Sequence, residues 1–220
     1  MSHNSFFYSK VTRFFSTKPI LSNSLFCLGS WSLGDVAAQK LEHNYWNNNN
    51  DGSKQPFEWN TRRTFNIASF GVLINGPVLA KWYPWLDRKV KFMNAQKFHD
   101  RLINSPIMNS NLKILIPPRK MSEPIAKLLV EIAVFDIPFL TIFFGYMNCI
   151  RGGSWDIFVH KLKHELPQTY ITSVGFWSAV QLWNFRFVPI VYQSVLVHAV
   201  SIFWDGFLSY RNEVSSHAID

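Results

Sequence analysis

Uncharged stretches long enough to cross a lipid bilayer dominate this chain. Residues 166–185 contain no Asp, Glu, Lys or Arg over 20 positions. A hydrocarbon core of about 30 Å needs roughly 20 predominantly apolar residues as a helix, so this stretch has the length of a membrane helix. Similar windows occur elsewhere in the chain. We therefore predict an all-α, multi-pass integral membrane protein.

These windows predict four transmembrane helices, at about 19–38, 64–86, 125–150 and 166–186. A fifth apolar helix follows at about 187–208, and Pro189 indicates a kink or a boundary before it. The sequence leaves open whether this fifth helix spans the membrane or lies against the other helices or along the interface.

Composition agrees with a membrane protein and argues against several soluble classes. Charged residues make up 16% of the chain, against about 25% in an average soluble domain. At 220 residues, the chain suits one or two domains, which excludes a large multidomain enzyme. Cys27 and Cys149 have no CxxC or zinc spacing, and we expect buried thiols.

Catalytic and metal-binding patterns are weak in this sequence. His160 and His164 are spaced like a metal-binding pair but have no third ligand nearby, so we expect a solvated helix face. We find no glycine loop that would cradle phosphate and no nucleophile elbow. We therefore expect neither an enzyme nor a bound cofactor.

Polar segments separate the predicted spans. They are a basic N-terminal segment at 1–18, an Asn-rich loop at 44–60, a basic loop at 87–124 and a polar tail at 211–220. Residues 81–127 hold ten Lys and Arg, the N-terminal segment adds three, and the opposite loops hold seven. Because positive residues resist crossing, we expect the N-terminus and the basic loop to share the more negative compartment.

The N-terminal segment has the composition of a mitochondrial presequence. The first 34 residues contain no acid, and Lys10, Arg13 and Lys18 alternate with hydroxyl and aromatic residues. The alternative is an amphipathic lead-in helix that stays in the mature protein and rests at the membrane interface.

Several polar residues fall at membrane depth, where an ionisable group costs about 2.5–3.5 kcal/mol and usually faces the bundle interior or a cavity. The candidate residues are Asp35, Asn75, Glu131, Asp136, Gln181, Asn184, Arg186 and Asp205. One hypothesis is a hydrated path lined by these groups. The alternative is that they hold the helices together, each acid either pairing with Arg186, Lys81 or Lys127 or bonding a neighbouring helix.

Spacing along a helix predicts which of these residues share a face. Glu131 and Asp136 lie five positions apart, about 140° around an α-helix, so they need not face the same way. Gln181 and Asn184 are three apart and should share a face. Candidate helix kinks are Gly76, Pro77, Pro138 and Pro189. We expect the Gly76-Pro77 pair to interrupt its helix, either as a packing kink or as a gate hinge.

Sequence blocks in all five of the predicted helical regions resemble one known family. They are LGDVAAQ at 33–39, NGPVLAKWYPWLDR at 75–88, LLVEIAVFDIP at 128–138, AVQLWNFRFVPIVYQ at 179–193 and WDGFLSY at 204–210. Together they resemble the Mpv/PMP-type family, which includes a small peroxisomal membrane channel and a mitochondrial inner-membrane protein linked to mitochondrial DNA depletion. Departures from the family pattern are Glu131 for an aspartate, Ser178 for a proline, Gln193 for an arginine and Asp205 for an asparagine.

The resemblance implies a four-helix organellar membrane protein whose relatives include weakly selective channels for small solutes. The acid-free N-terminus favours the mitochondrial inner membrane, with the peroxisomal membrane as the alternative. We expect membrane lipids, small solutes and further copies of this chain as partners. A non-channel scaffold is the second hypothesis. DNA attachment through the basic loop ranks last, because that loop lacks clustered aromatics, and we expect no nucleic acid partner.

Overall fold

The structure is a computed structural model that describes residues 13–49, 55–105 and 118–217, and within these ranges it contains helices and no strand. The all-α prediction is therefore confirmed. The elements are α2 (Pro19–Asn49), α3 (Thr61–Phe70), the π-helical η1 (Gly71–Asn75), α4 (Gly76–Met93), α5 (Ala95–Ile103), the short η2 (Arg119–Met121), α7 (Ser122–Val130), the π-helical η3 (Glu131–Asp136), α8 (Ile137–Ile150), α9 (Trp155–Phe187) and α10 (Ile190–His217).

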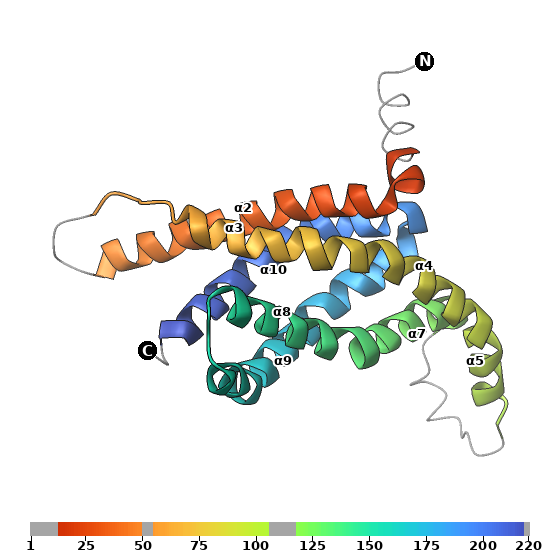
Figure 1. Cartoon of the computed structure of the whole chain (residues 1–220). Coiled ribbons are helices and arrows are strands. Elements are labelled where there is room, and N and C mark those ends of the chain that lie inside the picture. The colour runs from red at the N-terminus through yellow and green to blue at the C-terminus, as the bar shows by residue number, and fades with distance from the viewer. Residues whose placement is uncertain (1–12, 50–54, 106–117, 218–220) are drawn as a thin grey trace.

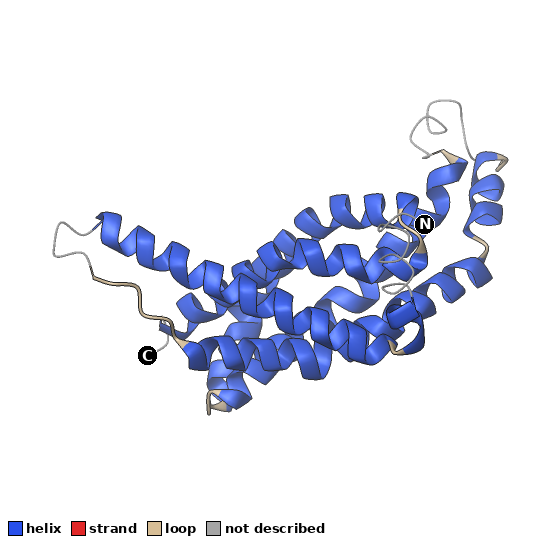
Figure 2. Ribbon diagram, turned by 90° about the horizontal axis from the view of Figure 1, so that it is seen from above, coloured by secondary structure: helices blue, strands red, loops and turns tan. Residues whose placement is uncertain are grey.

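Five long helical rods form one bundle in the described part of the chain (Figures 1 and 2). α3, η1 and α4 follow one another without a break, and so do α7, η3 and α8. α2 packs along α10 and also contacts α3, η1 and α4, so it lies at the centre of one layer. α9 packs against α7, α8 and α10.

Two prolines explain the two π-helical segments. Proline has no N–H, and its ring clashes with the carbonyl four residues earlier, which a wider π turn relieves. Pro77 and Pro138 each lie two residues after the last residue of a π segment. A hydroxyl from a neighbouring helix binds one carbonyl in each segment: Ser24 Oγ donates to Val72 O at 2.9 Å, and Tyr170 Oη donates to Ile132 O at 3.4 Å.

The chain does not break at Gly76-Pro77: the helix continues through both residues, and its hydrogen bonding changes to a wide π turn just before them. Gly76 has a packing role: a Cβ there would lie 2.5 Å from the Cα of Ser24 on α2. Pro138 likewise follows a π turn without ending its helix. Pro189 does mark a boundary, since α9 ends at Phe187 and α10 begins at Ile190.

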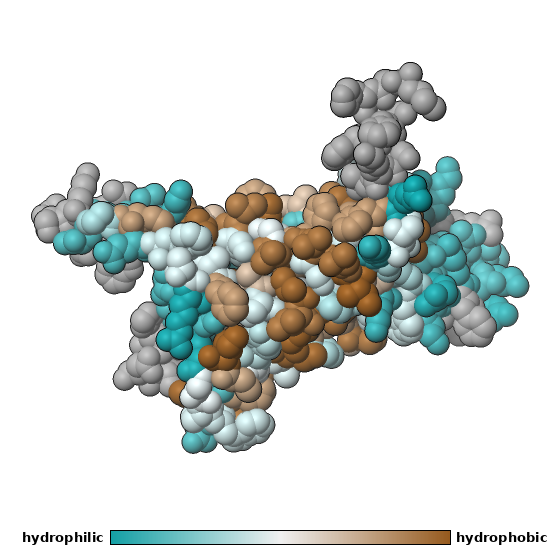
Figure 3. Space-filling model, turned by 45° about the horizontal axis from the view of Figure 1, so that its top comes forward, coloured by the Kyte–Doolittle hydropathy of each residue, from teal (hydrophilic) through white to brown (hydrophobic). Residues whose placement is uncertain are grey.

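The bundle is apolar outside and comparatively polar inside. Large apolar side chains on α2, η1, α8 and α10 are exposed, including Leu33, Leu73, Ile142 and Phe203. Figure 3 shows such residues as a brown belt across the middle of the face in view, with hydrophilic residues toward both ends. An exposed apolar belt of this kind fits lipid rather than water as the surrounding solvent.

Two helical segments are long and apolar enough to cross a membrane by length and composition alone, Ser122–Ile150 and Ile190–Glu213. The second is the helix whose role the sequence left open. α2 is long enough, but its buried side carries small polar residues such as Ser22, Asn23 and Ser30, which lower its mean hydropathy.

Helices extend beyond the predicted spans into three segments that we predicted as loop or tail. α2 runs to Asn49, inside the Asn-rich segment 44–60, because His43 and Asn47 both bond the carbonyl of Gln55. The basic segment 87–124 contains the end of α4, all of α5 and the start of α7. α10 continues to His217 in the predicted tail, where Arg211 pairs with Glu165 on α9. In each case tertiary contacts override weak local signals.

Candidate functional site

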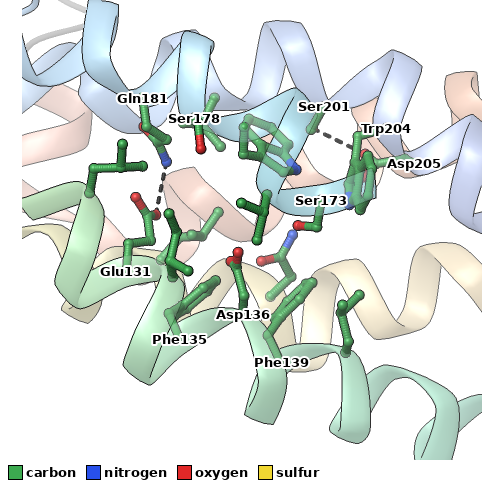
Figure 4. Close-up of a pocket in the computed structure, with 18 of the residues that line it drawn as sticks. Glu131, Phe135, Asp136, Phe139, Ser173, Ser178, Gln181, Ser201, Trp204 and Asp205 are labelled. Atoms are coloured by element: carbon green, nitrogen blue, oxygen red, sulfur yellow. Dashed lines mark hydrogen bonds between the residues drawn. The ribbon is translucent and has the colours of Figure 1, made fainter. Parts of the chain in front are cut away.

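A polar cavity lies inside the bundle between α4, the α7–η3–α8 rod, α9 and α10. Carboxyl, amide, hydroxyl and indole groups line it, with apolar side chains between them (Figure 4). Its polar lining residues are Asn75, Tyr83, Glu131, Asp136, Ser173, Ser178, Gln181, Ser201 and Asp205. Five of the eight candidate site residues from the sequence therefore meet here: Asn75, Glu131, Asp136, Gln181 and Asp205.

The π turn brings Glu131 and Asp136 to the same cavity. Our expectation that they need not share a face assumed 100° per residue, as in an α-helix. In a π-helix the hydrogen bonds run from i to i+5, so residues five apart lie nearly one above the other. Glu131 and Asp136 are the first and last residues of η3. Figure 4 shows both carboxyl groups projecting toward α9.

Gln181 connects the cavity to three other side chains. Its Nε2 donates to Glu131 Oε1 at 2.8 Å and to Tyr83 Oη at 2.9 Å. Its Oε1 accepts from Asn184 Nδ2 at 2.9 Å, so Gln181 and Asn184 share a face as expected. Asn184 also donates to the carbonyl of Gln193 at 3.3 Å, which ties α9 to the start of α10.

Three carboxyl groups in this cavity have no basic partner. No Lys, Arg or His occurs among the described residues that line it. Asp205 accepts a hydrogen bond from Ser201 Oγ at 3.1 Å, and Glu131 Oε2 is buried without a hydrogen bond of normal geometry. Trp31 also lines the cavity, and its indole Nε1 is likewise buried without a hydrogen bond of normal geometry. Buried groups of this kind usually bind ordered water.

The cavity is small, about 50 Å³. One water molecule requires roughly 10–15 Å³ when measured in this way, so the space holds only a few waters. It is therefore a small chamber and not an open pore in this conformation.

Asp35 lies in a separate polar cluster, and its partner is Arg63. Asp35 Oδ1 accepts from Arg63 Nε at 2.9 Å and from Ser209 Oγ at 2.5 Å. Its Oδ2 accepts from Gln39 Nε2 at 2.7 Å and from Thr64 Oγ1 at 2.5 Å. The carboxylate is fully buried and fully hydrogen-bonded, so it joins α2, α3 and α10.

The cations that we considered as possible partners for the acids of the cavity lie elsewhere. Arg186 is half-buried, and its guanidinium lies 5.3 Å from the ring centre of Phe187. Lys81 is exposed. Lys127 is buried but contacts Asp87 Oδ1 at 2.7 Å and Glu123 at 3.0 Å, at the end of the bundle. The hypothesis that these residues neutralise Glu131, Asp136 or Asp205 is therefore wrong.

The Asp87 carboxyl lies beyond the predicted span. Burial acts to raise its pKa, but hydrogen bonds from Lys127 and Lys91 outweigh burial and hold the pKa below its ordinary value. Lys91 Nζ lies 2.8 Å from Asp87 Oδ2, so the carboxylate bridges two lysines on different elements.

Cys27, His198 and Asn23 form a second connection between α2 and α10. Cys27 Sγ lies 3.7 Å from His198 Nδ1, and His198 Nε2 lies 2.9 Å from Asn23 Oδ1. These are the residue types of a cysteine–histidine–asparagine catalytic triad. All three are buried, however, and Cys27 and His198 do not line the cavity. Cys149 is exposed, contrary to our expectation.

Sequence reasoning missed Arg63, Tyr83 and the serines of the cavity. Arg63 carried a signal, because it directly precedes the uncharged run 64–80 and so lies at the same membrane level as the end of the first span. The serines carried none, since serine is common on any helix. The His160 and His164 rings are 4.4 Å apart, and no group of three metal-binding side chains occurs among the described residues.

Comparison with known proteins decides the family. A profile described as the Mpv17 / PMP22 family matches residues 148–209. The chain is 30% identical over 149 residues to "Mitochondrial inner membrane protein Mpv17" of Bos taurus, covering 68% of this chain and 70% of the relative. The chain belongs to the Mpv17 / PMP22 family. The resemblance seen in the sequence is confirmed.

Other members of the Mpv17 / PMP22 family match over most of their length. The chain is 26% identical over 195 residues to "Protein SYM1" of Saccharomyces cerevisiae, covering 89% of this chain and 84% of the relative. It is 27% identical over 179 residues to the Mpv17 protein of Homo sapiens, covering 81% and 82%. No solved structure matches the chain.

These relatives also bear on localisation. The Mpv17 proteins of cattle and human are both named as mitochondrial inner membrane proteins. The chain is accordingly an organellar membrane protein of the mitochondrial inner membrane, as predicted.

Proposed function

We propose that the protein is a channel through which small solutes or metabolites cross the mitochondrial inner membrane, and that it contributes in this way to mitochondrial homeostasis. The observation that carries this proposal is the group of three acids, Glu131, Asp136 and Asp205, that face one buried cavity without a basic partner. Ionisable groups at membrane depth line solute pathways far more often than they face lipid.

The proposal includes the number of membrane crossings. The four predicted spans correspond to α2, the α3–α4 rod, the α7–α8 rod and α9, and α10 adds a fifth crossing. Support comes from the apolar belt on the face shown in Figure 3 and from the length of α10. With five crossings, the two ends of the chain face opposite compartments.

Conduction requires a conformation wider than the present one. The cavity of about 50 Å³ holds a few waters and no metabolite. The two π turns border it through Asn75 on η1 and through Glu131 and Asp136 on η3. Such turns are frequent at functional sites, and a shift of one residue in their hydrogen bonding would rotate the acids relative to α9.

The test uses purified protein in planar bilayers under a salt gradient. We expect discrete conductances, and we expect Glu131→Gln combined with Asp136→Asn to shift the reversal potential, because the lining loses negative charge. Asp156→Asn, at an exposed residue near the start of α9, is the matched control and should leave the reversal potential unchanged. Folded protein that gives no conductance contradicts the proposal.

A scaffold without conduction is the second candidate, and the Asp35–Arg63 cluster favours it. That cluster uses buried polar groups only to hold helices together. If the cavity acids do the same, Glu131→Gln and Asp136→Asn will lower stability while flux stays absent in all forms of the protein. Both candidates assign the chain no catalytic chemistry, no cofactor and no nucleic acid partner.

We further propose that the protein assembles as a homo-oligomer, since one bundle encloses little room. Crosslinking in membranes with a lysine-reactive reagent, followed by mass measurement, tests this. A monomer at all protein-to-lipid ratios contradicts it, and conductance by that monomer would place the path inside one bundle.

A further inference from the structure

The short helix α5 crosses the end of the bundle. Asn94 adopts the left-handed conformation, with φ of 54°, and ends α4 at the point where α5 begins. Asn tolerates this conformation better than most residues, and it turns the chain sharply. In Figure 1, α5 therefore runs across the long axis of the bundle. A helix in this direction lies parallel to the membrane plane if the bundle stands upright in the bilayer.

α5 presents an apolar pair that no other described part of the chain covers. His99 is buried, and α5 packs against α7 and η2. Phe98 and Leu102, one turn apart, are 62% and 36% exposed. Phe98 and Leu102 lie next to the side of α5 that packs against α7 and η2, so this exposed apolar pair borders the contact with the bundle.

Exposed cations flank this pair. Lys97 and Arg101, also one turn apart, lie on the side of α5 away from His99. The neighbouring end of α4 adds three exposed basic residues, Arg88, Lys89 and Lys91. Of the acids nearby, Asp87 is already bound to Lys91 and Lys127.

Aromatic residues lie where the predicted second span ends. Trp82 and Trp85 on α4 stack with ring centres 5.0 Å apart, less than two turns before Asp87. Tryptophan collects at the headgroup level of bilayers. Figure 3 shows the brown surface giving way to hydrophilic residues at the end of the molecule that carries α5.

We propose that α5 lies in the membrane interface, with Phe98 and Leu102 inserted below the headgroups and Lys97 and Arg101 bound to the phosphates of anionic phospholipids. Such a helix combines apolar insertion with attraction to an anionic leaflet. The inference rests on the proposal that the bundle spans the membrane, but it is independent of channel activity.

The test measures the depth of spin labels on the full-length protein in liposomes. Cys149 is replaced by serine, and Cys27 stays because it is fully buried. Nitroxides are attached to cysteines introduced by Phe98→Cys, Gln96→Cys and Leu73→Cys in separate proteins. Gln96 is exposed on the other side of α5, and Leu73 is exposed in the middle of the predicted second span.

We expect the label at residue 98 to be shielded from a water-soluble nickel reagent and accessible to oxygen, and the label at residue 96 to be water-accessible. The label at residue 98 should lie deeper in liposomes with anionic phospholipid than in neutral ones. Lys97→Gln with Arg101→Gln should reduce that difference, since two such charges favour anionic over neutral lipid roughly 30-fold.

Two results overturn the inference. One is a label at residue 98 that is as water-accessible as the label at residue 96 in anionic liposomes. The other is equal depth in neutral and anionic liposomes. The Leu73 label separates this failure from failure of the membrane-spanning arrangement: an oxygen-accessible label at residue 73 shows that the bundle still spans and that only the assignment of α5 is wrong.

Discussion

Arg63 Nε lies 2.9 Å from Asp35 Oδ1, at a site where both side chains are almost completely buried. The guanidinium also binds Glu42, at 2.7 Å and 2.8 Å. The positive charge of Arg63 thus pairs with the negative charges of two carboxylates, and the arginine connects α2 to α3. Because the four hydrogen bonds to Asp35 come from three helices, the cluster fixes one end of the bundle.

Replacing Arg63 should destabilise the protein strongly. Arg63→Met leaves Asp35 buried without its cation, which costs about 3–5 kcal/mol for a buried pair that loses one partner. The neighbouring Arg62 is exposed, so Arg62→Met is the matched control and should change stability by less than about 0.5 kcal/mol. Thermal unfolding in detergent, followed by tryptophan fluorescence, measures both. Equal loss in the two variants would contradict the structural role of Arg63.

The glycine at position 34 should tolerate no side chain. A Cβ there would lie 2.6 Å from the carbonyl oxygen of Ile202 and 2.7 Å from the backbone nitrogen of Gly206. These are backbone atoms, so Gly34→Ala must push α2 away from α10, at a cost of about 1–3 kcal/mol.

Gly29 on the same helix is the control for that substitution. A Cβ at Gly29 meets nothing within 4 Å. Gly29→Ala should therefore be neutral or slightly stabilising, because alanine favours the helix by about 1 kcal/mol. The same unfolding assay compares the two. If Gly34→Ala is as stable as Gly29→Ala, then α2 and α10 do not approach as closely as described.

Gln181 should be required for the packing of α9 on α4 and η3. Gln181→Leu removes the donor to Glu131 and Tyr83 and the acceptor for Asn184. Leaving such buried groups unpaired costs about 1–3 kcal/mol. Trp183→Leu, at a side chain that is more than half exposed, serves as the control. Unfolding in detergent should show a lower Tm for the first variant and little change for the second.

The contribution of Asp87 should depend on pH. Its pKa in the folded protein lies below the ordinary value of 3.8, because Lys127 and Lys91 stabilise the carboxylate. The stabilisation is therefore fully present above about pH 4 and is lost as the pH falls through the folded pKa. Asp87→Asn should lower the free energy of unfolding by about 1–3 kcal/mol at pH 7.

Unfolding measured from pH 7 down to pH 3 checks this prediction. The difference between Asp87→Asn and the unaltered protein should shrink below pH 3.8. Asp156→Asn, at an exposed carboxylate, should show a small difference at every pH. A constant difference for Asp87→Asn over the whole range would mean that its effect is not electrostatic.

Many residues of the candidate site could be predicted from the sequence, but which of them meet in one cavity could not. Residue type and position within an apolar run were enough to select Glu131, Asp136, Gln181 and Asp205 as buried. The π turn before Pro138 could not be anticipated from α-helical spacing, and it is this turn that places Glu131 and Asp136 together. Asp35 was selected for the same reasons as the others, yet it belongs to a different cluster.

The sequence by itself determined that this chain is a helical membrane protein and roughly where its apolar helices lie, because bilayer thickness and helix rise act on each segment separately. Tertiary structure decided which polar groups meet. The pairing of Asp35 with Arg63 and the close crossing at Gly34 depend on how separate helices pack, and no local pattern specifies that packing.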